Sequence, residues 1–515
     1  MNKLYPIGIQ SFESLRKGGY CYVDKTQLVY QLVKTGKYYF LSRPRRFGKS
    51  LLLSTLEAYF KGQKELFAGL EIAGLEQAWQ EYPVLHLDLN AQKYTTSQDL
   101  ADILNAALSR WEKQYGSDAS EVSLSLRFQG IVRRAVERTA RNVVILIDEY
   151  DKPLLQSIGN ESLQTDYRNT LKAFYGVLKS CDKYIQFALL TGVTKFSKVS
   201  IFSDLNNLND ISMDDRYATI CGITEQELYS FFAEDIRSLG AMNNLDEIAT
   251  RQQLKEFYDG YHFTPSSADL YNPFSVLNTF DRKRFGSYWF ETGTPTFLVE
   301  LLQQKHYNLY QLAHEEVTED MLAGIDAMED SPIPVLYQSG YLTLKDFDSR
   351  FGLYTLGFPN REVEEGFNRY LLPRYASIQN GSSAFQIRNF VQEVWRGDID
   401  SFMLRLQSFF ADTPYELARD LELHYQNVLF IVFKLLGFYV QVEYHTSRGR
   451  IDLVLQTEKY IYVMEFKLEG SAEEALAQID EKQYALPFAS DPRILYKVGV
   501  NFNNQLRGIE KWLVR

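Results

Sequence analysis

The sequence has few cysteines, no excess of basic residues and no long apolar run. Cys21, Cys181 and Cys221 are scattered and odd in number, which excludes a disulfide framework and a zinc-ligand spacing. The net charge of −11 excludes a global attraction to nucleic acid, although a local basic groove stays open. The first residues form no apolar signal core, and no run of about 20 apolar residues could span a membrane. We therefore expect a soluble cytoplasmic protein with no membrane partner.

The composition that is present is typical of globular proteins. Hydrophobic residues make up 45% of the chain and charged residues 23%, close to the averages for soluble domains. At 515 residues the chain is too long for one core, because single cores stop growing near ~250–300 residues. We therefore expect two or three domains.

Apolar strands alternate with helical stretches in the first two hundred residues. Such alternation predicts a mainly parallel α/β sheet, and we assign residues 1–215 to this domain. The predicted elements are strands at residues 38–42, 84–90, 143–148 and 184–191, and helices that include residues 50–60 and 166–178.

A P-loop follows the first predicted strand. Residues 43–50 read Arg-Pro-Arg-Arg-Phe-Gly-Lys-Ser and lead into an apolar helix, whose N-terminal N–H groups and dipole would face phosphates. Lys49 is expected to reach the β- and γ-phosphates, and the Ser50 hydroxyl is expected to ligate Mg²⁺. Arg43 stands where the general motif has its first glycine, so the loop must turn without it.

Two carboxylates complete the predicted nucleotide site. The apolar strand at residues 143–148 ends in Asp148, which is expected to hold Mg²⁺ through water. Glu149 is then the natural general base for an attacking water. Thr191 ends a further strand, and both a γ-phosphate sensor and a simple cap stay open for it. The alternative, a chance Gly-Lys-Ser, becomes the minor one beside this carboxylate strand. The expected nucleotide-binding residues are Arg45, Arg46, Phe47, Gly48, Lys49, Ser50, Leu51, Asp148 and Thr191.

The middle of the chain is mostly helical and rich in aromatic residues. Thr224 and Glu227 form a capping box that opens a helix. Residues 340–344 and 352–356, joined by a polar turn, predict a hairpin. Helices followed by a hairpin suggest a winged-helix-like lid, and we assign residues 216–400 to it.

The last segment, residues 401–515, begins a different pattern. Residues 413–416 combine a helix cap, a first-turn proline and a carboxylate, which predicts a helix running to Gly437. The later elements complete an α-β-β-β-α-β unit. They are strands at residues 439–444, 450–455 and 460–467, a helix at residues 472–486 and a strand at residues 494–502.

Two acidic residues and a lysine in this unit predict metal-dependent phosphodiester chemistry. Asp452 and Glu465 are separated by the length of one hairpin, and Glu465 and Lys467 share a strand face. The carboxylates would supply oxygen ligands for Mg²⁺, and Lys467 would orient a water or stabilise the pentacovalent state. The alternative is a solvated, salt-bridged edge. The expected accessory residues are Glu422, Gln478 and Lys482.

Taken together, these motifs resemble a bacterial and archaeal family that fuses an AAA-like ATPase to a PD-(D/E)XK nuclease-like domain. The resemblance covers nearly the whole chain, most weakly across residues 345–410, and residues 43–50 look like that family's own P-loop. It implies an ATP- and Mg²⁺-binding module coupled to a metal-dependent nuclease fold. Related nuclease domains often carry Tyr four residues after the helix Gln, where this chain has Lys482. The matching segments are residues 22–26, 43–50, 147–151, 191–197, 258–261, 449–452 and 465–467.

The sequence leaves three functions open. The first is an ATPase whose nucleotide state controls a Mg²⁺-dependent nuclease acting on DNA or RNA, and the carboxylate pair with its lysine favours it. The second is a nucleotide-dependent switch with a catalytically silent nuclease fold, which the acidic neighbours Glu469, Glu473 and Glu474 favour. The third is an interaction protein that docks through the middle region. A homo-oligomer also stays open, because no single arginine finger stands out. The candidates for that finger are Arg216, Arg251 and Lys195.

Overall fold

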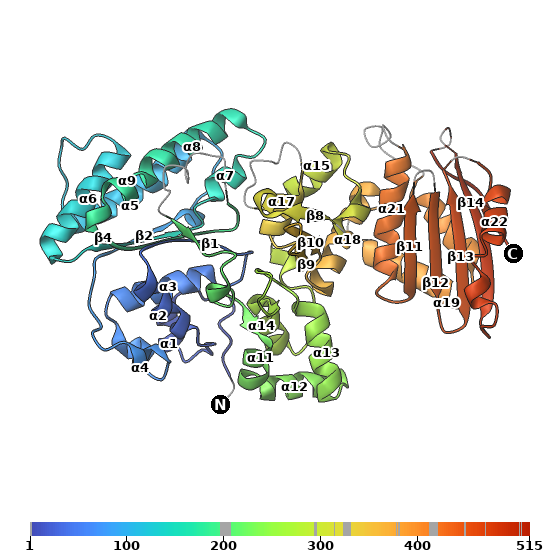
Figure 1. The fold of residues 1–515 in the computed structure, drawn as a ribbon, viewed down its shortest axis with the longest axis horizontal. Helices are drawn as coiled ribbons and strands as arrows, with labels where there is room; N and C mark the ends of the chain where they lie inside the picture. Colours follow the sequence, from blue (N-terminus) through green and yellow to red (C-terminus); the bar gives the residue numbers. More distant parts are fainter. Residues whose placement is uncertain are drawn as a thin grey trace. The chain divides into compact units, whose positions relative to one another are not determined.

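The chain divides into two units, each with its own β-sheet (Figure 1). Unit 1 comprises Met1–Gly293 and Glu316–Glu362, and unit 2 comprises Thr294–Glu315 and Val363–Arg515. The structure is a computed structural model. It describes residues 3–195, 208–292, 296–313, 315–322, 331–376, 378–379, 382–410, 421–447, 450–468, 470–503, 505 and 507–515.

The described part of unit 1 is built on a five-stranded parallel sheet with the strand order β2-β3-β4-β1-β5. All six residues of β3 are buried, which suits a central parallel strand covered on both faces. The predicted parallel sheet is confirmed, and the short β5 adds an edge that the sequence pattern did not indicate. The strands are β1 Tyr38–Ser42, β2 Val84–Asp88, β3 Val143–Asp148, β4 Ile185–Gly192 and β5 Asn209–Asp210.

Helices cover both faces of this sheet (Figure 1). The first four, drawn in blue, lie on one face, and α5, α6, α8 and α9 lie on the other. Helix α3 begins directly after Gly48 and buries Leu52, Leu53 and Leu56 against the sheet. The helices are α1 Phe12–Lys17, α2 Thr26–Thr35, α3 Lys49–Phe60, α4 Ile72–Leu75, α5 Ser97–Tyr115, α6 Leu124–Thr139, α7 Lys152–Gln156, α8 Glu161–Tyr175 and α9 Val177–Ser180.

The rest of unit 1 contains a helical group and a small antiparallel sheet. The capping box of Thr224 and Glu227 opens α11 as predicted, and Phe232 and Phe280 stack in the buried core of this group. The predicted hairpin is also confirmed, as β9 and β10. The elements are β6 Ile223–Thr224, α11 Glu225–Phe231, α12 Ala233–Asn243, α13 Glu247–Tyr258, β7 Leu270–Tyr271, α14 Pro273–Arg282, β8 Glu316–Thr318, α16 Glu319–Leu322, α17 Ile333–Gln338, β9 Thr343–Asp348 and β10 Leu353–Gly357.

Unit 2 contains a mixed sheet with the order β11-β12-β13-β14-β15, in which β13 and β14 are parallel and the other neighbours antiparallel. The predicted α-β-β-β-α-β unit is confirmed, and β15 adds an edge strand. The predicted helix start at residues 413–416 lies outside the described residues. The elements are α15 Thr296–Gln304, α18 Arg361–Tyr375, α19 Ser383–Arg396, α20 Ile399–Ser408, α21 Leu421–Leu436, β11 Gln441–Ser447, β12 Arg450–Gln456, β13 Tyr460–Lys467, α22 Ala472–Glu481, β14 Ile494–Asn503 and β15 Gly508–Val514.

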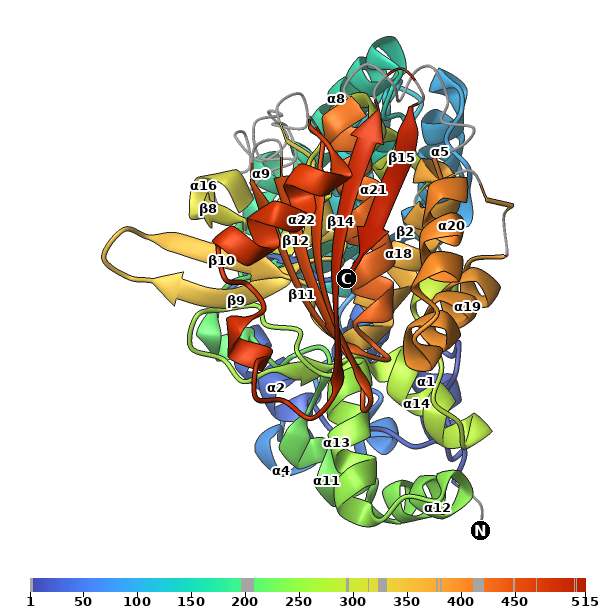
Figure 2. The same cartoon turned by 90° about the vertical axis from the view of Figure 1, so that its right-hand side faces the viewer.

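The two faces of this sheet carry different helices (Figure 2). Ile461 and Val463 of β13 pack with Ile479 of α22. Phe466, which points to the other face, contacts Phe433 of α21 at a ring distance of 6.1 Å. Because strand side chains alternate, the residues of β13 that share a face with Val463 lie on the α22 side. These residues include Glu465 and Lys467 at the end of the strand.

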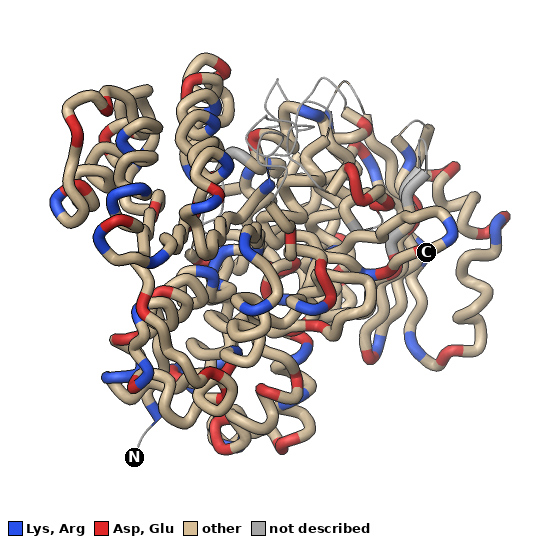
Figure 3. The backbone as a smooth tube through the Cα atoms, turned by 60° about the vertical axis from the view of Figure 1, so that its left-hand side comes forward, with Lys and Arg blue, Asp and Glu red and all other residues tan. Residues whose placement is uncertain are grey.

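Acidic and basic residues are intermixed along the chain (Figure 3). The sequence has 66 acidic and 55 basic residues, so the slight acidic excess is distributed among neighbours of the opposite sign. Within the described part of the chain, the structure contains no helix long and apolar enough to cross a membrane.

Candidate functional site

A cavity of about 410 Å³ lies where β1 ends and α3 begins. Gly48 adopts a left-handed backbone (φ 97°) as the N-cap of α3. A Cβ added there would meet no atom within 4 Å, so this backbone faces open space. N–H groups at a helix N-terminus bind anions, so the cradle fits a phosphate group. Of the expected nucleotide-binding residues, the cavity wall includes Arg45, Arg46, Gly48, Lys49, Ser50 and Leu51.

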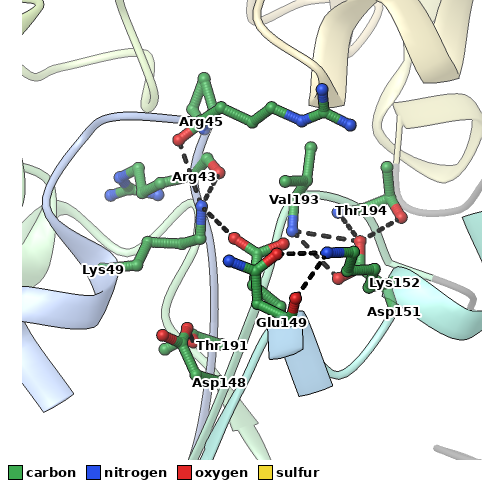
Figure 4. A network of polar contacts seen from close by, with 12 residues as sticks. Arg43, Arg45, Lys49, Asp148, Glu149, Asp151, Lys152, Thr191, Val193 and Thr194 are labelled. Carbon is green, nitrogen blue, oxygen red and sulfur yellow. Dashed lines mark hydrogen bonds and ion pairs between the residues drawn. The ribbon is translucent and has the colours of Figure 1, made fainter. Parts of the chain in front are cut away.

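Lys49 is buried at this wall and its amine is held inside the loop (Figure 4). Its Nζ donates to the carbonyls of Arg43 at 3.0 Å and Pro44 at 3.3 Å. The same Nζ lies 3.5 Å from Glu149 Oε1. A buried cation needs such compensation, and a phosphate in the cavity would provide the same charge balance.

Arg43, which replaces the glycine of the general motif, is buried and lines a different cavity, with its guanidinium directed away from Glu149 (Figure 4). Its Nη1 donates to the carbonyls of Ser42 at 2.9 Å and Ser212 at 2.7 Å. Its guanidinium also lies 4.2 Å from the ring centre of Phe263, and burial lowers its pKa. Arg43 therefore anchors the loop, while Arg45 and Arg46 are the arginines at the cavity.

Asp148 and Thr191 form a buried pair behind the cavity wall. The Thr191 hydroxyl donates to Asp148 Oδ1 at 2.7 Å. Glu149, by contrast, lines the cavity and has a left-handed backbone with φ 53°. Arg46, also at the wall, has φ 65°. Such conformations cost about 1–3 kcal/mol for residues other than glycine and cluster at functional sites.

Phe47 does not line the 410 Å³ cavity. Its ring packs edge-on against Tyr261 at 4.7 Å and Phe263 at 5.5 Å. It also borders a neighbouring apolar cavity of about 110 Å³, which shares Gly48 and Leu51 with the larger one. Phe47 is therefore placed among the residues of the helical group rather than at the phosphate cradle.

Sequence reasoning missed Lys152 and Asn90, which also line the cavity. Lys152 Nζ donates to the Asn90 carbonyl at 2.9 Å and to the Asn90 side chain, and burial lowers the lysine's pKa. Both residues follow parallel strands, and the carboxyl ends of parallel strands meet at one sheet edge. That rule was the signal that could have found them.

Asp151 is a further residue that sequence reasoning left without a role. It is fully buried and accepts hydrogen bonds from Thr194 N at 2.6 Å and Val193 N at 3.1 Å (Figure 4). Burial, with the charge of Glu149 second, raises the pKa of Asp151 to about 6. Asp151 therefore fixes the segment that follows Thr191.

The three candidates for an arginine finger are all engaged within the chain. Lys195 pairs with Asp210 at 2.6 Å and Arg216 with Asp214 at 2.5 Å, and Arg251 pairs with Glu247. The described residues that line the 410 Å³ cavity include none of the three.

In unit 2, Asp452 and Glu465 are directly opposite each other on β12 and β13. Opposite residues of an antiparallel pair share a face with Cβ atoms about 4.5–5.5 Å apart. Glu465 is fully buried, and Lys467 Nζ lies 3.7 Å from its Oε1. The same amine donates to Gln478 Oε1 of α22. His445, which the sequence did not suggest, is opposite Asp452 on β11.

The donor set at this site fits Mg²⁺. Among the described residues, no three His, Cys, Asp or Glu side chains form a group able to hold a metal. Mg²⁺ is usually held by one or two carboxylates with water and phosphate oxygens completing its shell, which the Asp452 and Glu465 pair can supply.

The other two expected accessory residues lie elsewhere. Glu422 is on α21, the helix that packs on the opposite face of the sheet from α22, and accepts a hydrogen bond from Gln426 Nε2 at 3.2 Å. Lys482 is the exposed C-cap of α22. Glu469, and residues 196–197 and 449 of the motif segments, lie outside the described residues.

Comparisons with known proteins agree with this arrangement. Residues 6–202 match a family model described as a predicted AAA-ATPase. Residues 420–512 match the PD-(D/E)XK nuclease superfamily. The chain is 35% identical to the "Uncharacterized protein in vnfD 5'region" of Azotobacter chroococcum mcd 1, and the match spans 99% of both chains. The chain therefore belongs to the family of predicted AAA-ATPase-like proteins that carry a C-terminal PD-(D/E)XK nuclease superfamily domain.

Proposed function

We propose that the chain is an ATP-binding protein whose nucleotide state controls Mg²⁺-dependent cleavage of DNA or RNA. Residues 1–215 would bind and hydrolyse ATP, residues 216–400 would form the lid, and residues 401–515 would cleave. The observation that carries this proposal is the cavity in unit 1, where Lys49, Ser50 and Glu149 meet at the N-terminus of α3.

Each residue of the nucleotide site has a distinct role in this proposal. Lys49 exchanges its contacts with loop carbonyls for the β- and γ-phosphates. Ser50 and, through water, Asp148 would hold Mg²⁺, and the Thr191 hydroxyl orients Asp148. Glu149 accepts a proton from the attacking water. Mg²⁺, when bound, neutralises phosphate charge.

The apolar cavity beside the phosphate cradle supports a nucleoside triphosphate over a simple phosphate. It shares Gly48, Leu51 and Pro273 with the larger cavity, and its remaining lining is apolar, as at Val23, apart from Lys25 and Thr55. A planar base would bury its faces there while the phosphates occupy the polar cavity.

The nuclease half rests on the carboxylate pair of unit 2. Asp452 and Glu465 would hold Mg²⁺, which would supply charge neutralisation for a phosphodiester and lower the pKa of a bound water. Lys467, 3.7 Å from Glu465, would place its amine beside the scissile phosphate and stabilise the added negative charge.

Nucleotide binding is tested by titrating a fluorescent ATP analogue with Mg²⁺ into the native chain and Lys49→Ala. We expect the substitution to weaken binding at least about tenfold, because a buried phosphate contact is lost. Lys61→Ala is the matched control, since Lys61 follows the same helix and pairs with Glu57 at the surface. Equal affinity of the native chain and Lys49→Ala would contradict the assignment.

Cleavage is tested on single- and double-stranded DNA and RNA with Mg²⁺, with and without ATP. Lys467→Ala should abolish cleavage, whereas Lys511→Ala, which removes an exposed lysine paired with Glu473, should not. ATP should change the rate of the native chain and leave that of Lys49→Ala unchanged. If native chain and Lys467→Ala behave alike on every substrate, the nuclease role is wrong.

The alternative is a nucleotide-dependent switch or interaction protein with a silent nuclease fold. The burial of Glu465 and the engagement of the Lys467 amine by Gln478 favour it. The acidic neighbours favour it less than the sequence suggested, because Glu473 pairs with Lys511 and Glu474 caps α22. The cleavage assay with Lys467→Ala separates the two functions.

A further inference from the structure

Residues far along the chain hold the P-loop in unit 1. The indole Nε1 of Trp289 donates to the carbonyl of Arg45 at 2.9 Å. Gly340 (φ 87°) lies so close to Pro44 that an added Cβ would be 2.6 Å from the proline ring. Every contact of this kind ties the position of the loop to the position of the segment that it touches.

The backbone around Trp289 is held in turn by a buried carboxylate. Trp289 N donates to Glu362 Oε1 at 2.6 Å, and the Ser275 hydroxyl donates to Glu362 Oε2 at 2.6 Å. The backbone N–H groups of Tyr288 and Phe290 also stabilise the ionised Glu362. Glu362 is 1% exposed, so losing one of these donors would leave a buried carboxylate oxygen short of a hydrogen bond, which is costly.

The second oxygen of Glu362, Oε2, is connected to the 410 Å³ cavity through α14. Ser275 is in the first turn of α14, next to Phe274, which lines the nucleotide cavity. The guanidinium of Arg46 lies 5.0 Å from the ring centre of Phe274. Two chains of contacts therefore connect the P-loop to the Glu362 carboxylate. One joins Arg45 to it through Trp289, and the other joins Arg46 to it through α14.

Glu362 is the second residue of α18 and the last residue of unit 1. From Val363 onward, this helix belongs to unit 2. A helix transmits displacement along its axis because each turn is hydrogen-bonded to the next. The carboxylate that receives the P-loop contacts therefore lies on an element that both units share.

We propose that Trp289 and Glu362 form a relay that reports the state of the P-loop to α18, and through this helix controls unit 2. The relay rests on the proposed function, because a nucleotide must bind to change the loop. When the loop closes on phosphates, the Arg45 carbonyl moves, and its directional bond to the indole either moves Trp289 with it or breaks. If Trp289 moves, its backbone N–H shifts relative to Glu362 Oε1, which accepts its hydrogen bond.

The test is hydrogen exchange of the full chain, with and without a non-hydrolysable ATP analogue and Mg²⁺, followed at residues 286–292 and 361–375. Trp289→Phe removes the indole N–H and keeps an aromatic ring. Trp111→Phe is the matched control, since Trp111 of α5 is equally buried and stacks on Phe128 of α6. Analogue affinity is measured for each variant in parallel.

In the native chain and in Trp111→Phe, the analogue should change exchange at residues 361–375 at least about threefold. In Trp289→Phe it should still bind within about threefold of the native affinity, but the response at residues 361–375 should disappear. Glu362→Gln, which keeps one acceptor oxygen, should restore part of the response that Glu362→Ala loses. A Trp289→Phe response equal to the native one overturns the relay. A native chain that binds the analogue without a response also overturns it, whereas absence of analogue binding overturns the proposed function itself.

Discussion

Glu362 should make the stability of unit 1 decrease as the pH rises from 5 to 8. Burial raises the pKa of this carboxyl to about 7, whereas a Glu in an unfolded chain titrates near ~4.3. Between these values the folded chain keeps a proton that the unfolded chain has released. The unfolded state then binds fewer protons, so the free energy of unfolding falls with rising pH. The difference of roughly 2.7 pKa units corresponds to about 4 kcal/mol as an upper value.

The assay compares thermal unfolding of the full-length native chain with Glu362→Gln at pH 5, 6, 7 and 8. On the proposed function, the transition of unit 1 is the one that Mg²⁺ and ATP raise, because a ligand stabilises the unit that binds it. Gln is neutral throughout, so subtracting the two midpoints removes every other titrating group. We expect the native midpoint to fall by several degrees relative to Glu362→Gln, mostly below pH 7.

Glu256→Gln is the control for that experiment. Glu256 also lies in unit 1 and pairs with Arg361 at 2.9 Å, but its side chain is half exposed. The difference in unfolding midpoint between Glu256→Gln and the native chain should not vary across this pH range in the same way. The reasoning from burial would be refuted by either of two results. The difference in unfolding midpoint between the native chain and Glu362→Gln stays constant with pH, or the native midpoint rises relative to that of Glu362→Gln as the pH rises.

Three further changes have defined outcomes. Asp151→Asn should leave at least one N–H of the segment after Thr191 without its acceptor, at a cost of about 1–3 kcal/mol, and hydrogen exchange at residues 192–194 should accelerate. Gly499→Ala would place a Cβ 2.3 Å from the Ala472 carbonyl at the start of α22, so the unfolding midpoint of unit 2 should drop. Gly74→Ala, whose Cβ would meet nothing within 4 Å, should leave its own unit unchanged. Chelation of Mg²⁺ by EDTA should stop any cleavage by the native chain, and restored Mg²⁺ should recover it; cleavage that persists in EDTA would contradict a metal-dependent site.

The nucleotide half of the fold was predictable because its signals are local. A strand, a loop and an apolar helix adjacent in sequence define the P-loop, and the helix indeed begins at Lys49 with Gly48 in a left-handed conformation. The direction in which the Arg43 side chain points was not predictable from the sequence. Its partners, Ser212 and Phe263, are brought to it only by the tertiary fold. Trp289 was missed for the same reason, since a single Trp in an aromatic-rich region carries no sequence signal.

In unit 2 the pairing of Asp452 with Glu465 followed from the length of one hairpin, and the structure has them in register. Several strands escaped prediction. In unit 1, β8 spans Glu316–Thr318, too short for any periodicity to show. β15 has the apolar neighbours Trp512 and Leu513 on opposite faces and an irregular register with β14, so it lacks the period-two alternation that marks a half-buried strand.

The replacement of a P-loop glycine by Arg43 can be understood from what the side chain contacts. A glycine would let the loop turn but would leave nothing to hold it. Arg43 instead bonds the Ser212 carbonyl and, with its other nitrogen, the carbonyls of Tyr217 and Ala218, so the end of β1 is fixed to the segment beyond β5. The loop is also anchored two residues later, where the Arg45 carbonyl accepts a hydrogen bond from the Trp289 indole. A loop anchored at successive residues cannot rearrange around phosphates alone, because its neighbours must rearrange with it. That coupling favours a nucleotide that acts as a control input, and it is why Trp289 rather than Lys49 is the position where binding and control should separate.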